Sequence, residues 1–567
     1  MKLLFDIETN GLLRETPSRR WNEETNKWEA IIIPQLDKAW CIVAIDENNK
    51  QYLFRPHQIK EGIELLKSAD TLIGHNIIGF DLIVLQKWYD INLYEHCKIM
   101  DTLVLSLLFN PIREKGHSLK AWGEKLGYPK GDHTDFDKFS EEMLEYCIRD
   151  TKIVKKLSAE LKKESAGFSK QSIFLEHETR RVICNQIENG FAFDYKKASM
   201  LLATLSQRKK EVEDKVKETF KAKETEHIIF PLETKKGEVS KRGKLFGTEK
   251  QINLTDEEYD RFKTGCVTSV KRLLVTDFNL GSRKQIGEYL IEFGWKPNKF
   301  TPAGQPIVDE VTLEKIIHIP EAQLIAEFLL LQKRIGYVQS WMDAVAKEDN
   351  RIHGNVITNG AITSRMTHYN PNMTQIPSIH KPYGKECREC WTVDNGNVLL
   401  GIDASGLEVR MLAHYMKDKE YINEIINGDI HTTNQKLAGL ESRDKAKTFI
   451  YALMYGAGDA KLGSVVGGNK KDGKRSRQYF FDNQPSFKSL RDRVARAATK
   501  GHIKGLDERR IFIRNQHASL NSLLQGAGAI VMKKALTLFD ETLQDLNMDY
   551  RFVANIHDEW QLEVPKN

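Results

Sequence analysis

The composition of this 567-residue chain excludes intrinsic disorder, because hydrophobic residues make up 40% and charged residues 29% of it. No apolar run reaches the roughly 18 residues of a membrane-spanning helix, and the acidic start MKLLFDIETN excludes a secretory signal peptide. The 85 Lys and Arg residues against 79 Asp and Glu residues give a net charge of +6, which permits a nucleic-acid partner without requiring one.

The N-terminal part of the chain is predicted to form an α/β unit over residues 1–165. The segments LLFDIE and TLIGHN have the pattern of short strands, and FDLIVLQKWY has the pattern of a helix. Residues 166–345 are predicted to be mainly helical and highly charged. Within them, residues 221–275 show weak periodicity and contain the basic run KKGEVSKRGK at 235–244, which either is a solvated loop or contacts DNA or a protein partner.

The C-terminal part is predicted to combine strands with a long helical region. Residues 353–427 mix strands and turns, and NVLLGIDASG has the pattern of a strand that ends in an acid. Residues 428–524 have helical character. The runs YRFVANI and WQLEV, joined by HDE, predict a β-hairpin.

Acidic residues near the N-terminus form a pattern of their own. Asp6 and Glu8 are two apart on a predicted strand and therefore point to one face, although a solvated strand end would explain two acids alone. Asp81, together with Tyr146 and Asp150 four apart on a predicted helix, completes the pattern D-x-E, D, Y-x3-D. This pattern resembles the DEDDy class of 3′–5′ exonucleases. The resemblance implies that the four acids hold two metal ions and that Tyr146 orients the attacking water.

Two further acids lie far apart in the sequence. Asp403 ends a predicted strand, and Asp558 stands beside Glu559 at the tip of the predicted hairpin. A polar turn would explain HDE alone. A two-metal phosphoryl-transfer site, however, needs carboxylates from separate elements, and Asp403 and Asp558 would supply them if their strands are neighbours in one sheet.

A polar stripe is predicted along one helix between these acids. Four residues recur at every fourth position of RDKAKTFIYALMYGAG: Arg443, Lys447, Tyr451 and Tyr455. Ser442 and Gly456 have the character of helix ends. The cations suit a triphosphate and the tyrosine rings suit a base or a sugar, whereas the alternative is a solvated surface face.

The segments DASGLEVR, R-x3-K-x3-Y-x3-YG and HDE, in this order, resemble motifs A, B and C of family A (DNA polymerase I type) DNA polymerases. The segments MDTLVLSLLFN, QKRIG and GDIHTTNQ are similar to those of the replicative polymerases of T-seven-type lytic phages. The resemblance implies a multidomain α/β protein, with an RNase H-like 3′–5′ exonuclease domain and a right-hand polymerase that has an antiparallel palm sheet and helical thumb and fingers. The implied domains are the exonuclease (1–165), thumb (166–350, with a processivity-factor insertion near 221–275), palm (351–427 and 525–567) and fingers (428–524).

The resemblance also implies roles for the residues around the second pair of acids. Asp403 and Asp558 would bind two Mg²⁺ ions, for which Mn²⁺ can substitute, and Glu559 would assist. Three side chains would contact the phosphates of the incoming dNTP: His431, Arg443 and Lys447. Lys447 would also donate a proton to the pyrophosphate.

Three more residues would contact the sugar or the base of the nucleotide. Glu408 would reject ribonucleotides by crowding the 2′ position of the sugar. Tyr451 would influence the acceptance of dideoxynucleotides, and Tyr455 would stack near the templating base.

Polar residues of two further segments would contact the minor groove of primer–template DNA, which presents acceptors at every base pair. They are Arg365, Gln375, His517, Asn521 and Gln525. The last three are predicted to share one helix at four-residue spacing. Ser364 stands where the family more often has glycine.

The implied partners are DNA, dNTPs, host thioredoxin at residues 221–275, and a replicative helicase–primase, with no membrane, in the cytoplasm of a bacterial host. The alternatives left open are a single-subunit RNA polymerase and a non-catalytic DNA-binding remnant. Because the chain ends soon after Glu559 and family members continue further, a truncated or split polymerase that needs a C-terminal fragment for synthesis is a further alternative.

Overall fold

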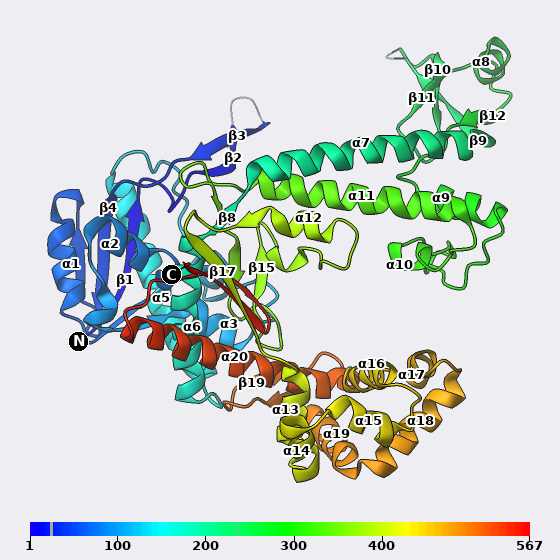
Figure 1. Ribbon diagram of the computed structural model, residues 1–567. Coiled ribbons are helices and arrows are strands. Elements are labelled where there is room, and N and C mark those ends of the chain that lie inside the picture. The colour runs from blue at the N-terminus through cyan, green and yellow to red at the C-terminus, as the bar shows by residue number, and fades with distance from the viewer. Residues whose placement is uncertain (23–26, 235, 567) are drawn as a thin grey trace. The chain divides into compact units, whose positions relative to one another are not determined.

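The computed structural model describes residues 1–22, 27–234 and 236–566, so Lys235 of the basic run lies outside the described residues (Figure 1). The chain divides into two compact units. One comprises Met1–Phe193, Ala344–Ile376 and Trp391–Asn567, and the other comprises Asp194–Asp343 and Pro377–Cys390. In the part of the chain that the structure describes, no helix has both the length and the apolar character that crossing a membrane requires.

The first unit begins with a five-stranded mixed sheet in the order β5-β4-β1-β6-β7. Its strands are β1 (Lys2–Thr9), β4 (Ala39–Asp46), β5 (Gln51–Phe54), β6 (Thr71–Gly74) and β7 (Lys98–Asp101). β1 runs antiparallel to β4 and parallel to β6. A separate antiparallel pair follows β1 in the chain: β2 (Thr16–Asn22) and β3 (Lys27–Ile33).

Helices cover both faces of this sheet because side chains alternate along β1. The helices are α1 (Ile59–Lys67), α2 (Asp81–Tyr89), α3 (Thr102–Phe109), α4 (Leu119–Lys125) and α5 (Glu141–Glu164). Leu3 and Phe5 share a core with α1 and α2, whereas Leu4 shares a core with α3, α4 and α5. Asp6 and Glu8 have the same parity as Leu4, so they point toward the face that α5 covers.

A second sheet in the same unit contains three antiparallel strands in the order β17-β21-β20. These are β17 (Asn397–Asp403), β20 (Arg551–Ile556) and β21 (Glu559–Pro565). The core beside this sheet contains residues of α6 (Lys170–Asn189), α13 (Leu407–Met416) and α20 (Ser519–Asp545). Shorter strands complete this region: β8 (Phe191–Phe193), β13 (Arg351–Ile352), β16 (Trp391–Thr392), β14 (Asn355–Ile357) and β15 (Thr367–Tyr369).

Helices dominate residues 419–498, which confirms the helical prediction from residue 428 to residue 498, while the first of these helices lies before that bound. They are α14 (Lys419–Asn427), α15 (Ile430–Ala438), α16 (Arg443–Met454), α17 (Asp459–Val466), α18 (Lys470–Asn483) and α19 (Pro485–Ala498). Phe449, Phe480 and Phe487 lie at the centre of their shared core. A hairpin that was not predicted follows them, β18 (His502–Lys504) with β19 (Arg510–Phe512), and α20 runs without a break across the predicted boundary at residue 524.

The second unit contains the long helices α7 (Tyr195–Thr219) and α11 (Pro320–Asp343), which pack side by side (Figure 1). Shorter helices accompany them: α9 (Arg283–Glu292), α10 (Glu310–Leu313) and α12 (Gly384–Glu389). The predicted thumb, 166–350, and this unit overlap without sharing bounds, because α6 belongs to the first unit. The domain boundaries therefore stay a prediction.

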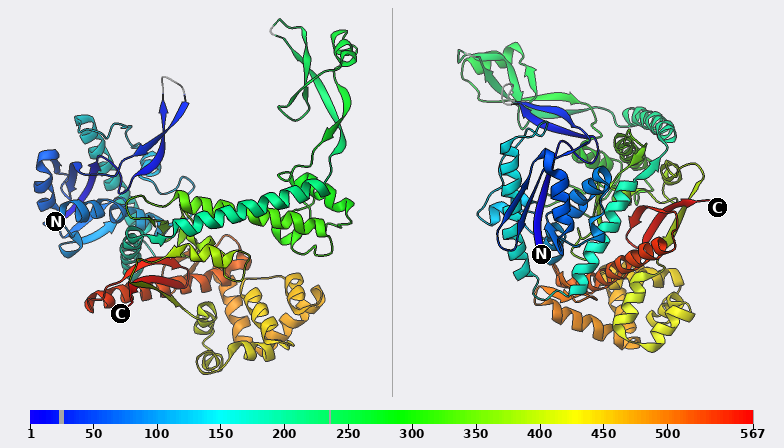
Figure 2. Two further views of the ribbon diagram at one scale, coloured as in Figure 1. Left: turned by 45° about the horizontal axis from the view of Figure 1, so that its top comes forward. Right: turned by 90° about the vertical axis from the view of Figure 1, so that its left-hand side faces the viewer.

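The expectation of a mainly helical segment is wrong for residues 223–276, which form a sheet in the order β11-β10-β9-β12 (Figure 2). Its elements are β9 (Lys223–Glu233), β10 (Val239–Leu245), β11 (Gln251–Asn253), α8 (Asp256–Lys263) and β12 (Val270–Thr276). Ile229, Leu245 and Val270 form one buried face against Phe262 of α8. This core is small and few apolar residues alternate regularly along its strands, which explains why the sequence showed neither strong helical nor strong strand periodicity.

A buried charge network joins α6 to α20 in the first unit. Glu176, completely buried, accepts hydrogen bonds from Lys533 Nζ at 2.7 Å and from the guanidinium of Arg509, which also binds Asp507. Burial opposes the ionisation of Glu176, but the attraction of Lys533 and Arg509 holds its pKa below the ordinary value. Burial lowers the pKa of Lys533 to about 8.

Replacing Glu176 by Gln should destabilise the first unit by about 3–5 kcal/mol, because two buried cations would share too little negative charge. The lowered pKa of Glu176 adds a pH dependence. Its contribution is present above the unfolded-state pKa of about 4.3 and is lost as the pH falls through the folded-state value. Urea unfolding at pH 7 measures the effect. The matched control is Glu178→Gln, which removes a partly exposed ion pair to Arg181 and should change stability by at most about 1 kcal/mol.

Candidate active sites

Four acids of the N-terminal unit converge at the end of β1. Asp6 and Glu8 lie on β1, Asp81 begins α2, and Asp150 lies on α5. Burial raises the pKa of Asp6 well above its ordinary value, and the charges of Glu8, Asp81 and Asp150 raise it further. Burial likewise raises the pKa of Asp81 to about 7, although its Oδ1 accepts a hydrogen bond from Ile7 N at 3.1 Å. The structure therefore brings the four predicted acids together, and the described residues around them supply too little positive charge to balance four carboxylates.

The donor atoms of this cluster fit a divalent cation. Ligand atoms of Asp6, Glu8 and Cys147 lie within 4.8 Å of one another. Among the described residues, Asp150 Oδ1 is buried without a hydrogen-bond donor. Carboxylate oxygens are the ligands that Mg²⁺ and Mn²⁺ prefer, and an unpartnered buried oxygen is a ready ligand. The sequence did not point to Cys147, since a single buried cysteine on a helix has no distinguishing pattern.

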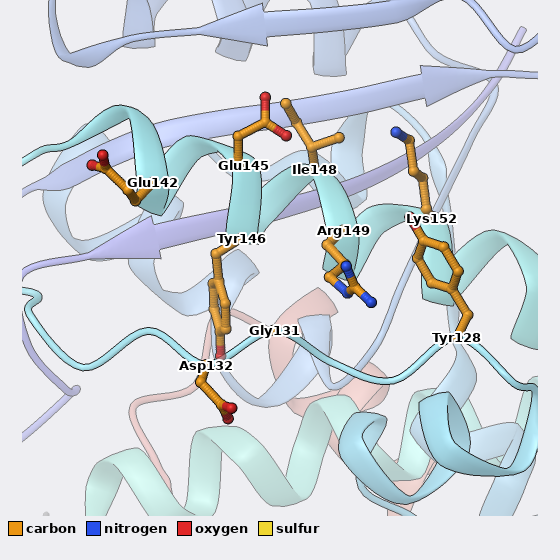
Figure 3. Close-up of a pocket in the computed structure, with 9 residues that line it drawn as sticks. All are labelled: Tyr128, Gly131, Asp132, Glu142, Glu145, Tyr146, Ile148, Arg149 and Lys152. Carbon is orange, nitrogen blue, oxygen red and sulfur yellow. The ribbon is translucent and has the colours of Figure 1, made fainter.

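Tyr146 lies one helical turn before Asp150 on α5. Figure 3 shows its ring reaching from α5 toward the loop that contains Gly131 and Asp132. The rings of His133 and Phe136 lie 5.8 Å and 6.2 Å from it. Burial raises the pKa of Tyr146, while the nearby charge of Lys130 opposes that rise. Tyr146 is thus held beside the acids by aromatic neighbours from the loop before α5.

Lys130 is a second residue of this site that the sequence did not indicate. Its Nζ forms an ion pair with Asp150 Oδ2 at 2.6 Å and lies 4.8 Å from the centroid of the Tyr146 ring. Its side chain is 26% exposed, in contrast to 3% for Asp150. A lone lysine in the turn-rich segment YPKGDH looks like a solvated loop residue until the fold places it.

The second pair of acids meets in the β17-β21-β20 sheet. Asp403 pairs with Glu559 across β17 and β21, and Ala404 N donates a hydrogen bond to Asp558 O at 2.9 Å. β17 and β21 are thus neighbours in one sheet, as a two-metal site formed by Asp403 and Asp558 requires. Burial raises the pKa of Asp403, and the charges of Asp558 and Glu559 add to that effect. Asp403 is nevertheless exposed, so its carboxylate is accessible to a cation and a substrate.

Glu408, at the start of α13, is buried beside these acids with both carboxylate oxygens occupied. Arg365 Nη2 donates to Oε1 at 2.8 Å, and the Tyr455 hydroxyl donates to Oε2 at 2.6 Å. Burial, followed by the bond to Glu408, raises the pKa of Tyr455 to about 12. The contacts fix the orientation of a carboxylate that the sequence alone could place only on a helix.

Arg365 follows a residue with an uncommon backbone conformation. Ser364 has a φ of 60°, in the left-handed region that glycine enters without a penalty. This explains why glycine suits the position. Ser364 is buried, and the turn it forms places Arg365 against Glu408.

The polar stripe of α16 has the expected helix ends. Ser442 accepts a hydrogen bond from Lys445 N, and Gly456 has a φ of 74°. Tyr455 lies at the C-cap, one residue beyond the helix, because the chain turns at Gly456. The cations therefore occupy the first turns of α16, and the tyrosines occupy its last turn and its cap.

Asp429 orients the cationic end of this stripe. Arg443 donates from Nε to Asp429 Oδ2 at 2.6 Å and from Nη2 to Oδ1 at 3.1 Å. His431 lies on α15 near both Arg443 and Lys447. Burial and these two charges lower the pKa of His431, so at neutral pH its imidazole is neutral. The His431 ring lies 6.4 Å from the ring of Tyr451.

The residues predicted to contact DNA occupy three places. Asn521 and Gln525 lie on α20, as predicted, but His517 lies in a 3-10 turn (Gln516–Ala518) before the helix begins. A Cβ at Gly456 would lie 2.3 Å from His517 O, so α16 and this turn are closely packed. Gln375 is exposed in another 3-10 turn, Met373–Gln375, with no hydrogen bond to the other four among the described residues.

The sequence profile described as DNA polymerase family A matches residues 249–567. A DNA-directed DNA polymerase of Enterobacteria phage T3 is 33% identical over 99% of this chain and 93% of its own length. One of Escherichia phage T7 is 32% identical over 94% of this chain and 92% of its own length. A solved structure, the POL domain of Pol1 from M. smegmatis in complex with DNA primer-template and dNTP, has a TM-score of 0.73. It is 18% identical, over 94% of this chain and 87% of that chain, and shows a similar fold. The chain belongs to DNA polymerase family A.

Proposed function

We propose that this protein is a template-directed DNA polymerase that also degrades DNA from the 3′ end, and that it replicates phage DNA. The observation that supports synthesis most directly is the position of Asp403, at the end of β17, beside Asp558, in the turn that leads into the neighbouring strand β21. Asp403 and Asp558 would hold two Mg²⁺ ions, for which Mn²⁺ can substitute, to activate the primer 3′-hydroxyl and stabilise charge on the phosphate. Glu559, which pairs with Asp403 from β21, would assist them.

Helix α16 would bind the triphosphate of the incoming dNTP. Arg443 is already oriented by Asp429, and Lys447 is exposed one turn further along α16. The neutral imidazole of His431 would donate a hydrogen bond to a phosphate oxygen, and Lys447 would protonate the leaving pyrophosphate. Tyr451 and Tyr455 lie on the same stripe, where they would contact the sugar and the templating base.

Minor-groove contacts would come from the side of α20. Arg365, His517, Asn521 and Gln525 offer donors that reach acceptors present at every base pair. Arg365 already binds Glu408, so a contact with DNA would link the groove to the residue that crowds the 2′ position of the sugar. Gln375 would act from its own exposed turn.

The N-terminal cluster supports the 3′–5′ exonuclease. Asp6, Glu8, Asp81 and Asp150 would hold two Mg²⁺ ions, which supply an activated water and stabilise the leaving 3′ oxygen. Tyr146 would orient that water from its position one turn before Asp150. The unpartnered oxygen of Asp150 is the observation that favours a cation site over a solvated acidic patch.

The sheet of residues 223–276 in the second unit, called the inserted sheet below, would bind a protein partner, and host thioredoxin is the first candidate. Phe230, Leu273 and Val275 lie on the sheet face opposite α8, and Phe246 contacts Phe230 with 5.8 Å between ring centroids. Val275 is 70% exposed and Phe246 is 68% exposed. Exposed apolar residues grouped on one face are typical of an interaction surface.

Asp558→Ala should reduce primer extension by more than about 100-fold and leave 3′ degradation intact, because it removes a ligand of only one centre. Asp6→Ala should have the opposite effect. Both reactions are followed on one labelled primer–template, with and without dNTPs. Loss of both reactions in either variant would contradict two independent sites.

The same assay addresses the alternative of a split polymerase. Val398, Leu399 and Leu400 of the edge strand β17 are 39–43% exposed, which favours a further segment that covers them. Degradation without synthesis by the unaltered chain, with synthesis restored by a C-terminal polymerase fragment, would support that alternative.

Tyr455→Phe should lower the discrimination between dNTPs and rNTPs by about tenfold, because a hydrogen bond to a charged group contributes about 1.5–3 kcal/mol. The Tyr455 hydroxyl is one of two groups that orient Glu408. Incorporation of dCTP and CTP opposite one template base gives the ratio. Tyr451→Phe is the matched control. It should alter the use of dideoxynucleotides and leave the ratio of dCTP to CTP incorporation unchanged. An equal fall of this ratio in both variants would contradict the role of the Tyr455–Glu408 hydrogen bond.

Leu273→Ser combined with Phe246→Ser should weaken the binding of reduced thioredoxin at least tenfold, since both side chains would lose their apolar contacts. Retention on immobilised thioredoxin and the length of DNA made per binding event are the measurements. The matched control is Ile317→Ser, which replaces a 78% exposed apolar residue of the same unit that lies outside the sheet. Thioredoxin that binds and leaves this length unchanged would contradict its role as a processivity factor.

A further inference from the structure

The loop between α4 and α5 places one ammonium group at the rim of the N-terminal acid cluster. Lys130 Nζ contacts Asp150 Oδ2 at 2.6 Å, and it lies 4.8 Å from the centroid of the Tyr146 ring. The side chain is 26% exposed, so one side of the ammonium faces solvent while the other faces the acids. An ammonium has three donors, and its interactions with Asp150 and with the Tyr146 hydroxyl leave one of them for another acceptor.

The position of Lys130 is fixed by the residues on either side of it. Arg149 of α5 donates from Nε to Pro129 O at 2.6 Å, and its guanidinium stacks 4.8 Å from the centroid of the Tyr128 ring. A Cβ at Gly123 would lie 2.8 Å from Tyr128 O and 3.1 Å from Lys130 N, so the loop packs directly on α4. A loop clamped on both sides holds the ammonium in one place, as a binding site requires.

The charge of Lys130 reaches most of the cluster. Its positive charge favours the ionised forms of Asp6, Glu8 and Asp150. A phosphodiester that enters this site meets several carboxylates, whose repulsion must be offset. A fixed cation with a free donor on its open side can offset part of that repulsion and bind a phosphate oxygen directly.

We propose that Lys130 contacts a non-bridging oxygen of the scissile phosphate, which joins the 3′-terminal nucleotide to the preceding one, and is a catalytic residue of the exonuclease reaction. The inference rests on the proposed exonuclease function. In that reaction the oxygen of water bonds to phosphorus and the bond from phosphorus to the preceding 3′ oxygen breaks. One proton of the water passes to solvent, and the 3′ oxygen takes one from solvent. Lys130 keeps its proton throughout and stabilises the charge on the phosphate.

The test compares ligands with and without a phosphate, in the Asp558→Ala background so that the second site does not contribute. Binding of thymidine 5′-monophosphate and of thymidine is measured by calorimetry in Mg²⁺. Lys130→Met should weaken binding of the monophosphate at least tenfold and leave thymidine binding unchanged. It should also reduce kcat/KM for degradation of a single-stranded oligonucleotide at least tenfold, and Lys130→Arg should restore most of both.

Lys152→Met is the matched control, because Lys152 is a lysine of α5 that lies near Tyr128 and lines a pocket beside Tyr146 (Figure 3). It should change neither quantity. Equal weakening of both ligands by Lys130→Met, or no weakening of either, would overturn the phosphate contact and leave the exonuclease in place. If the Asp558→Ala protein itself neither degrades DNA nor binds the monophosphate, the proposed exonuclease fails and the inference fails with it.

Discussion

The first unit depends on the buried ion cluster around Glu176. This carboxylate on α6 binds Lys533 of α20 and Arg509 of the preceding hairpin, where water cannot compensate for a missing partner. The same helix contacts the N-terminal sheet, since Asp101 N donates to His177 Nε2 at 2.9 Å and Arg180 donates to Asn76 Oδ1. Because α6 is anchored on both sides, the segment before Asp81 and the helix that carries Asn521 and Gln525 belong to one continuous body.

The two acid centres in this body differ in burial, and that difference suits different substrates. Asp81 and Asp150 are almost completely buried, and burial raises the pKa of each, so this centre is the more enclosed of the two. Asp403 stands exposed at the end of an edge strand. A frayed single-stranded end can enter the first kind of site, whereas a duplex with its paired nucleotide needs the open surface of the second. Family A membership and the proposed pair of activities are compatible with this contrast.

The sequence predicted residues whose roles follow from regular spacing. Asp6 and Glu8 alternate on a strand, the α16 stripe recurs each turn, and the hairpin around Asp558 has a clear pattern, so their surroundings were predictable. Lys130 and Asp429 could not be found in this way, because each acts through a contact between segments that only the fold brings together. The inserted sheet was missed for a related reason. Its core is small and few apolar residues alternate regularly along its strands, so the order of the side chains gave little sign of them.

The cations beside the two centres are prepared to different degrees. Lys130 is held by Asp150, and Arg443 is held by Asp429, so each has a fixed direction before any phosphate arrives. Lys447 is exposed and has no ion pair among the described residues. A side chain that donates a proton must come within hydrogen-bond reach of the departing group, which an unpaired side chain is free to do, whereas one that stabilises charge works best when it is already in place. The free lysine on α16 and the held lysine beside Asp150 therefore fit proton transfer and charge stabilisation, respectively.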